Sequence, residues 1–264
     1  LSCPLDANTH YIEKIKKLDY DKISDRELMN YATGRWTPQG SISSDNPKYK
    51  WLKTFLGQTH KNKTLIICSS RESVTEIAGF LESQNGTSST TSVAIFHEGL
   101  SIVERDKEAA KFTDTDGPQV LITSEIGGEG RNFQCAKTLI LMDIPRLPDL
   151  LEQRIGRLDR IGQGKRIQIV IPWLRNTPEE AFFHWYNKGL NAFKQSWNGA
   201  NPVLEFFAED LLQLFRDFLP GSPSFLNRMS LLELLIKKTQ KHAANIQTPS
   251  LKLFAMMCYV FVMF

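Results

Sequence analysis

Short apolar runs alternate with helical patterns through the middle of this chain. The runs cover residues 64–68, 93–96, 120–123, 138–142 and 167–171. Between them, apolar side chains recur at the spacing of a helix that buries one face. Strands that are apolar throughout are typical of a parallel sheet covered on both sides. We therefore predict an α/β fold, a parallel sheet with helices on both faces.

Polar and glycine residues follow four of these runs directly. They are Ser69 with Ser70, residues 97–99, residues 124–130, and Asp143. In parallel sheets, ligands bind at the carboxyl ends of the strands. The sequence therefore predicts a functional site along this edge.

The pattern divides the chain into three parts. Residues 1–45 read as a linker or packing arm, residues 46–174 carry the alternation, and residues 175–264 form a helical appendage. Two serine–glutamate pairs match the capping box and predict helix starts, Ser24 with Glu27 and Ser101 with Glu104.

The appendage contains no further strand alternation, and we predict three helices over residues 177–197, 203–218 and 224–242. Its aromatic residues recur at helical spacing, which favours a core or an interface over a stacking platform for bases. These aromatic residues are Phe182, Phe183, Trp185, Tyr186, Phe193 and Trp197. Residues 253–264 are entirely apolar, but a membrane span needs about 20 residues. We expect a buried element of a truncated domain there.

Composition excludes little. The net charge of +3 neither requires nor excludes nucleic acid, so any basic surface must be local. The four cysteines lack CxxC spacing, which argues against a zinc site or a disulfide framework. We predict no metal site in this chain and expect a reducing, cytoplasmic location.

Residues 149–162 combine an apolar stripe with clustered arginines. On a helix, Leu151, Ile155 and Leu158 share one face. The opposite face carries Gln153, Gly156, Arg157 and Arg160. Pro148 and Asp149, with Glu152 three residues later, resemble a capping box, and Gly162 is a plausible stop.

Two arginines one turn apart repel each other unless an anion lies between them. Guanidinium groups match phosphate oxygens in a bidentate way. Solvated arginines on an ordinary amphipathic helix are the alternative interpretation.

The string QRIGRLDRIGQ at residues 153–163 resembles motif VI of superfamily-two helicases, in the form found in SWI/SNF-type DNA translocases. SEIGGEGRNFQ at 124–134 resembles their motif V, and Ser69-Ser70 resembles motif IV. Together with residues 167–174 and 184–193, these blocks resemble the RapA-like ATPases associated with bacterial RNA polymerase. One departure is Leu147-Pro148, where that family usually has Asn-Pro.

The resemblance implies a RecA-like helicase C-terminal lobe and a set of functional residues. Catalytic arginines would be Arg157 and Arg160. Residues at the ATP would be Gln153, Gly128, Glu129 and Gly130. Residues that contact nucleic acid would be Ser69, Ser70, His97, Gly99, Arg105 and Ser124.

The resemblance also implies ATP with Mg²⁺, double-stranded DNA as the favoured track, RNA polymerase, and a first lobe of the same protein as partners. The sequence holds neither a GxxxxGK[ST] loop nor an Asp-Glu-x-His box. The family keeps both in the first lobe, so we expect no significant ATPase activity from this chain alone. Two alternatives stay open: a non-catalytic module that binds RNA polymerase, and the lobe of an RNA helicase.

Overall fold

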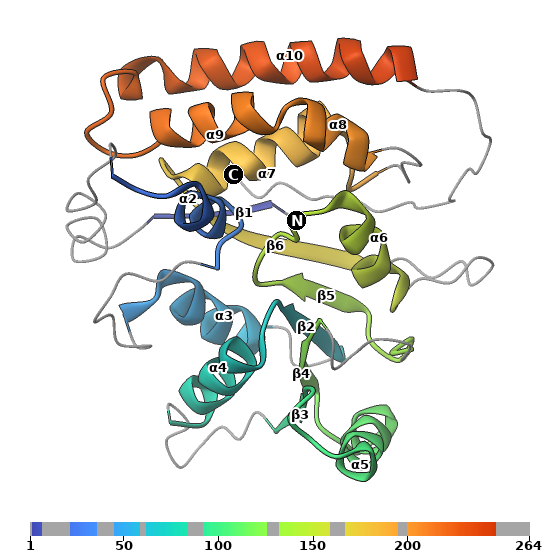
Figure 1. The fold of residues 1–264 in the computed structure, drawn as a ribbon. Coiled ribbons are helices and arrows are strands. Elements are labelled where there is room, and N and C mark those ends of the chain that lie inside the picture. The colour runs from blue at the N-terminus through green and yellow to red at the C-terminus, as the bar shows by residue number, and fades with distance from the viewer. Residues whose placement is uncertain are drawn as a thin grey trace.

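In the computed structural model, one parallel sheet forms the framework of the molecule (Figure 1). The structure describes residues 2–6, 22–35, 45–58, 62–83, 92–125, 132–158, 167–194 and 200–246. Within them, six strands lie in the order β1-β6-β5-β2-β4-β3. Their bounds are Ser2–Leu5 for β1, Thr64–Cys68 for β2, Val93–Phe96 for β3, Val120–Ser124 for β4, Thr138–Leu141 for β5 and Gln168–Leu174 for β6. All five predicted strands are confirmed, as is the parallel α/β fold.

Alternation along each strand separates two packed faces. Ile66 and Cys68 of β2 pack in the cluster that contains α3 (Pro47–Gln58) and α4 (Arg71–Ser83). Leu65 and Ile67 belong to the other cluster, beneath α5 (Ile102–Thr113) and α6 (Pro148–Gly156). Successive side chains of a strand point to opposite faces, and both faces here are covered by helices.

The segment before residue 46 adds an edge strand and a helix. The sequence did not predict β1, which pairs with β6 in the register Ser2 with Ile171 and Leu5 with Leu174. Helix α2 (Asp25–Ala32) contacts helices of the appendage and begins with the predicted capping box of Ser24 and Glu27. The second predicted capping box, at Ser101, starts α5.

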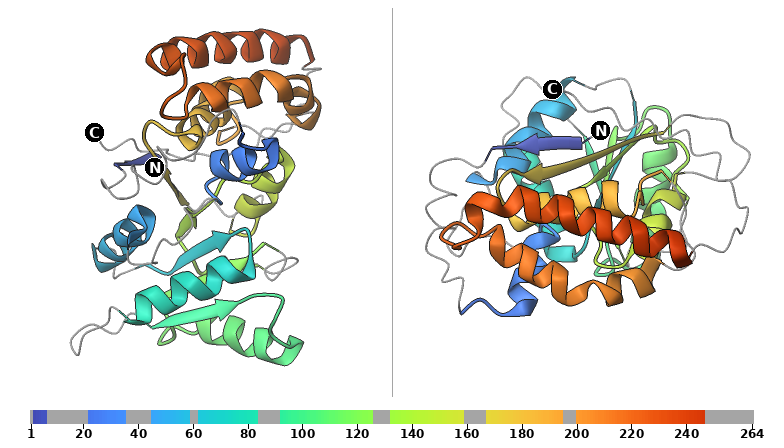
Figure 2. Two further views of the ribbon diagram at one scale, coloured as in Figure 1. Left: turned by 60° about the vertical axis from the view of Figure 1, so that its left-hand side comes forward. Right: turned by 90° about the horizontal axis from the view of Figure 1, so that it is seen from above.

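The helical appendage stacks on the β6 side of the sheet, with α10 outermost (Figures 1 and 2). Its elements are α7 (Pro178–His184), the π-helical turn η2 (Trp185–Gly189), α8 (Ala200–Phe206), α9 (Ala208–Asp217), the 3₁₀ turn η3 (Phe225–Asn227) and α10 (Arg228–Ile246). One buried cluster continues from the sheet into these helices. The division of the chain at residues 45 and 174 stays a prediction.

The predicted helix over 177–197 was wrong in its extent. The helix widens at η2, and Asn191 takes a positive φ of 54°. Asparagine tolerates this conformation, but helices do not use it. The predicted packing role of the aromatics is confirmed for five of them, since Phe182, Phe183, Trp185, Tyr186 and Phe193 are buried. Trp197 lies outside the described residues.

Among the described helices, none is both long and apolar enough to cross a membrane. The apolar residues 253–264 lie outside the described part of the chain.

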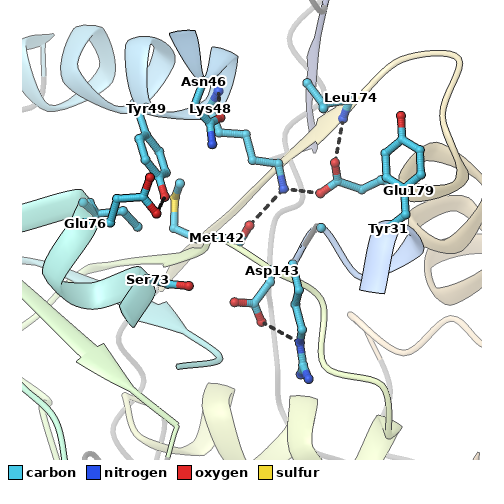
Figure 3. A pocket seen from close by; sticks show the side chains of 13 residues that line it. Tyr31, Asn46, Lys48, Tyr49, Ser73, Glu76, Met142, Asp143, Leu174 and Glu179 are labelled. Atoms are coloured by element: carbon cyan, nitrogen blue, oxygen red, sulfur yellow. Dashed lines mark hydrogen bonds and ion pairs between the residues drawn. The ribbon is translucent and has the colours of Figure 1, made fainter. Parts of the chain in front are cut away.

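A buried ion pair joins the sheet domain to the appendage (Figure 3). Lys48 on α3 pairs with Glu179 on α7, and both side chains are almost fully buried. The Lys48 ammonium also donates to the Met142 carbonyl at 2.9 Å, and Glu179 accepts from the Leu174 N–H at 3.2 Å. Burial raises the pKa of the Glu179 carboxyl, and Lys48 opposes that shift. A buried charge of this kind is tolerated only while its partner is present.

We expect Lys48→Met to lower the free energy of unfolding by about 3–5 kcal/mol, because it strands the Glu179 carboxylate. Lys48→Met combined with Glu179→Gln removes both charges and keeps an acceptor for Leu174. The free energy of unfolding of the double variant should therefore fall by less than the sum of the losses in the two single variants. Urea unfolding of the chain and its three variants measures this cycle. Additive losses would show that the two residues do not act as a pair.

Candidate functional site at the carboxyl edge of the sheet

Strand register brings the predicted site residues to one edge. Cys68 lies beside Ser124 and Phe96 beside Thr123, so β2, β4 and β3 end together. Ser69, Ser124 and the residues after β3 are therefore neighbours, as predicted from the strand ends. Arg160, Gly128, Glu129, Gly130 and Gly162 lie outside the described residues.

Asp143, just beyond β5, contacts both the end of β2 and helix α6. Its Oδ2 accepts from the Ser69 N–H at 2.6 Å, and its Oδ1 lies 3.0 Å from Nη2 of Arg154. Arg35 approaches the same Oδ1 at 4.0 Å. Asp143 is buried, so these donors replace the water that its charge has lost.

Figure 3 shows Asp143 on the wall of a pocket that also contains the Lys48–Glu179 pair. Two further charged residues line it: Arg35, 4.0 Å from Asp143, and Glu76, which accepts from the Tyr49 hydroxyl at 3.2 Å. Because these charged groups already face partners inside the protein, we assign no ligand to this pocket.

Arg154 was missed by the sequence analysis, and its side chain is completely buried. Nε and Nη2 donate to the two carboxylate oxygens of Glu125 at 2.9 and 3.1 Å, and Nη1 donates to the Asp143 carbonyl at 2.8 Å. Burial works against the charge, but the carboxylates of Asp143 and Glu125 outweigh it and raise the pKa of the guanidinium. The signal available was position, since Arg154 falls within the apolar stripe between Leu151 and Leu158.

Helix α6 differs from its prediction at both ends. Leu147 is the N-cap residue and its side chain makes no capping hydrogen bond, while Pro148 is the first residue of the helix. The predicted capping box is therefore wrong. Proline suits this position because its missing N–H has no partner in the first turn. The described helix ends at Gly156, where the N–H of Leu158 bonds to the Ile155 carbonyl and tightens the last turn.

Arg157 lies at the C-cap of α6 and is 8% exposed, whereas Gln153 and Gly156 face solvent. Its Nη2 donates to the Glu125 carbonyl at 2.8 Å, and its own carbonyl accepts from the Phe133 N–H at 2.9 Å. Glu125 and Phe133 flank the glycine-rich segment. The two motifs recognised in the sequence are therefore joined at Arg157. The apolar stripe of Leu151, Ile155 and Leu158 is buried, as predicted.

The candidate nucleic-acid residues form a second group, in which Ser124 and His97 are buried and Gly99 is exposed. Ser70 Oγ accepts from the Ser73 N–H at 3.2 Å, a backbone donor in the first turn of α4. Ser124 Oγ donates to Glu98 at 2.5 Å, and His97 Nδ1 accepts from the Gly99 N–H at 3.1 Å. Burial, assisted by the charge of Arg71, lowers the pKa of His97. The imidazole is then neutral at pH 7, and Nε2 carries its proton. Arg105 is half-buried on α5.

Arg71 is a second residue that the sequence analysis missed. It is the exposed first residue of α4, directly after Ser70. Its guanidinium lies over Gly99, where an added Cβ would stand 2.6 Å from Arg71 Cζ. The absence of a side chain at Gly99 leaves room for this approach, which adds a cation to the group formed by Ser69, Ser70 and His97.

In the described part of the chain, no three His, Cys, Asp or Glu residues gather as metal ligands.

Comparisons with known proteins agree with this geometry. The family model of the helicase conserved C-terminal domain matches residues 47–162. The chain therefore carries a helicase C-terminal lobe. The model of the RNA polymerase recycling family C-terminal region matches residues 166–250. The chain is a RapA-like helicase C-terminal domain followed by the RapA C-terminal region.

Curated relatives and solved structures support that assignment. RNA polymerase-associated protein RapA from one Pseudomonas putida strain is 45% identical over 191 residues, and that of another strain, GB-1, is 46% identical. Each match covers 70% of this chain and 20% of the relative, so the chain spans a fifth of the length of these proteins.

The Sulfolobus solfataricus SWI2/SNF2 ATPase core has a TM-score of 0.57 at 17% identity, covering 81% of this chain and 48% of that one. The same core in complex with double-stranded DNA gives 0.57 at 17% identity, covering 84% and 49%. At this identity the likeness concerns the fold alone.

We expect Arg154→Met to lower the free energy of unfolding by about 3–5 kcal/mol, because it leaves the buried Asp143 without its closest cation. Arg35→Ala is the matched control: Arg35 is partly exposed and 4.0 Å from the same carboxylate, so it should cost less than about 1 kcal/mol. Chemical unfolding of both variants gives the comparison. Equal losses would mean that Arg154 does not hold this edge together.

Proposed function

We propose that this chain is the second motor lobe of an ATP-dependent nucleic-acid translocase that acts with RNA polymerase. The observation that carries the proposal is Arg157, which bonds to both flanks of the glycine-rich segment. A side chain in that position links a candidate phosphate-sensing helix to a candidate nucleotide loop. The RapA name of the relatives supports RNA polymerase as the partner.

Arg157 and Arg160 would stabilise the charge that develops on the transferred phosphoryl group of ATP, which is the role of arginine fingers. Gln153 would orient them, and Gly128, Glu129 and Gly130 would contact the nucleotide. The Mg²⁺ ligands and the phosphate-binding loop are expected on the first lobe. Arg157 is nearly buried and its Nη2 donates to the Glu125 carbonyl. This contact places a guanidinium, a group that matches phosphate oxygens, beside the glycine-rich segment.

The group at the ends of β2, β4 and β3 would hold the nucleic-acid backbone. It comprises Ser69, Ser70, His97, Gly99, Arg105 and Ser124, to which we add Arg71. Hydroxyls, backbone amides and arginines bind phosphates without reading sequence, as a translocase requires. Double-stranded DNA is the favoured track, because one SWI2/SNF2 core of the same fold is described in complex with it.

A non-catalytic binding module is the second candidate. It is favoured by apolar side chains that the appendage leaves in solvent, including Phe206, Leu226 and Leu234. Such residues mark interaction surfaces when they gather in patches. ATP turnover separates the two candidates.

In a protein that joins this chain to its first lobe, Arg157→Ala should reduce ATP turnover by about 10³–10⁵ while nucleotide binding is retained. Arg175→Ala, an exposed arginine paired with Asp6, is the control and should leave turnover unchanged. The chain without a first lobe should show no turnover. Unchanged activity in Arg157→Ala would favour the binding module.

Arg71→Ala should weaken duplex binding. It should also reduce the magnitude of the slope of log K against log salt concentration by about 1, because one phosphate contact is lost. Lys111→Ala, at the far end of α5 and paired with Glu108, should leave the slope unchanged. Fluorescence anisotropy with duplex DNA and with RNA of equal length measures both variants. Tighter binding and stronger ATPase stimulation by RNA would support an RNA helicase instead.

A further inference from the structure

The loop that leads into α6 is held by the helical appendage. The Tyr186 hydroxyl lies 2.8 Å from the Pro145 carbonyl and 2.9 Å from the Arg146 carbonyl. A phenol has one proton to donate, so the two carbonyls share it. Tyr186 is fully buried, and burial raises its pKa well above the ordinary value. The hydroxyl therefore stays protonated, and remains a donor, at neutral pH.

Tyr186 is itself held rigidly. It lies in the π-helical turn η2, and its ring packs edge-on against Phe182 at 4.7 Å between centroids. The turn is anchored from the other side by Trp185, whose Nε1 donates to Thr239 of α10 at 2.9 Å. Single π turns inside α-helices occur frequently at functional positions. Here the turn aims one aromatic at the sheet domain and its neighbour at α10.

Two further contacts hold the same loop and the start of α6. The Ile144 N–H donates to the Thr33 carbonyl at the end of α2, at 3.0 Å. Asn201 of α8 donates to the Asp149 carboxylate at 2.6 Å. Of the contacts from the appendage, the Tyr186 hydroxyl is the buried one, so it has the least competition from water.

We propose that Tyr186 is a positioning residue for Arg157. Helix α6 has nine residues and behaves as a short rigid rod, so displacement at Pro148 reaches Arg157 at its other end. Misplacement of a reacting group by about 1 Å is enough to cost about 10² in rate. The appendage thereby sets the geometry of the candidate arginine finger. The catalytic part of this inference rests on the proposed function, whereas the positional part does not.

Hydrogen–deuterium exchange on the present chain tests the positional part. Tyr186→Phe removes only the hydroxyl, and exchange of the α6 amides should accelerate by about tenfold, as expected when a buried hydrogen bond is lost. Thr239→Val is the matched control, because it removes the buried hydrogen bond of the adjacent Trp185 without touching the loop. Its faster exchange should be confined to η2 and α10. Unchanged α6 exchange in Tyr186→Phe, or equal α6 exchange in both variants, would overturn the inference.

Steady-state kinetics in the two-lobe protein test the catalytic part. Tyr186→Phe should lower kcat by about 10–10² with KM for ATP unchanged, and Thr239→Val should change neither, at a temperature where both variants are folded. Arg157→Ala is assayed in parallel. If Arg157→Ala abolishes turnover while Tyr186→Phe matches Thr239→Val, the positioning role is overturned and the proposed function stands. If Arg157→Ala is fully active, the proposed function fails, and with it the catalytic role of Tyr186.

Discussion

The carboxylate of Asp143 connects the strand ends at the candidate site to helix α6. A buried negative charge must be neutralised and hydrogen-bonded, and here the partners come from the end of β2 and from α6. Arg154 must therefore point inward, which fixes the rotation of α6 about its axis. That rotation turns Gln153 outward and brings Arg157 to the Glu125 carbonyl. The position of the candidate finger thus depends on a different arginine, three residues earlier.

The appendage packs directly against the sheet that carries this edge. Its buried cluster is continuous with one face of the sheet, and Lys48 and Glu179 join the two parts through a charge pair that is unfavourable to separate. Tyr186 adds a contact to the loop before α6. Packed elements therefore connect the appendage to the start of α6.

Local patterns predicted a large part of this structure. The strands at 64–68 and 93–96 have the observed bounds, and the two serine caps are present, because each depends on residues within one element. The edge strand β1 escaped prediction, since four residues that include Pro4 acquire strand structure only through pairing with β6. The helix predicted over 177–197 failed where η2 widens and the chain turns at Asn191. Arg154 and Arg71 were missed because their roles depend on residues far away in the chain.

The sequence by itself determined the alternation of strands and helices, their caps, and the order of the motifs along the chain. These features follow from periodicity and from hydrogen bonds between near neighbours. The tertiary structure alone decided which arginine is buried against Asp143 and which meets the glycine-rich segment. It also decided that Tyr186 reaches a loop 40 residues earlier. Such contacts form only when folding brings distant segments together, and no local pattern encodes the partner of a buried polar group.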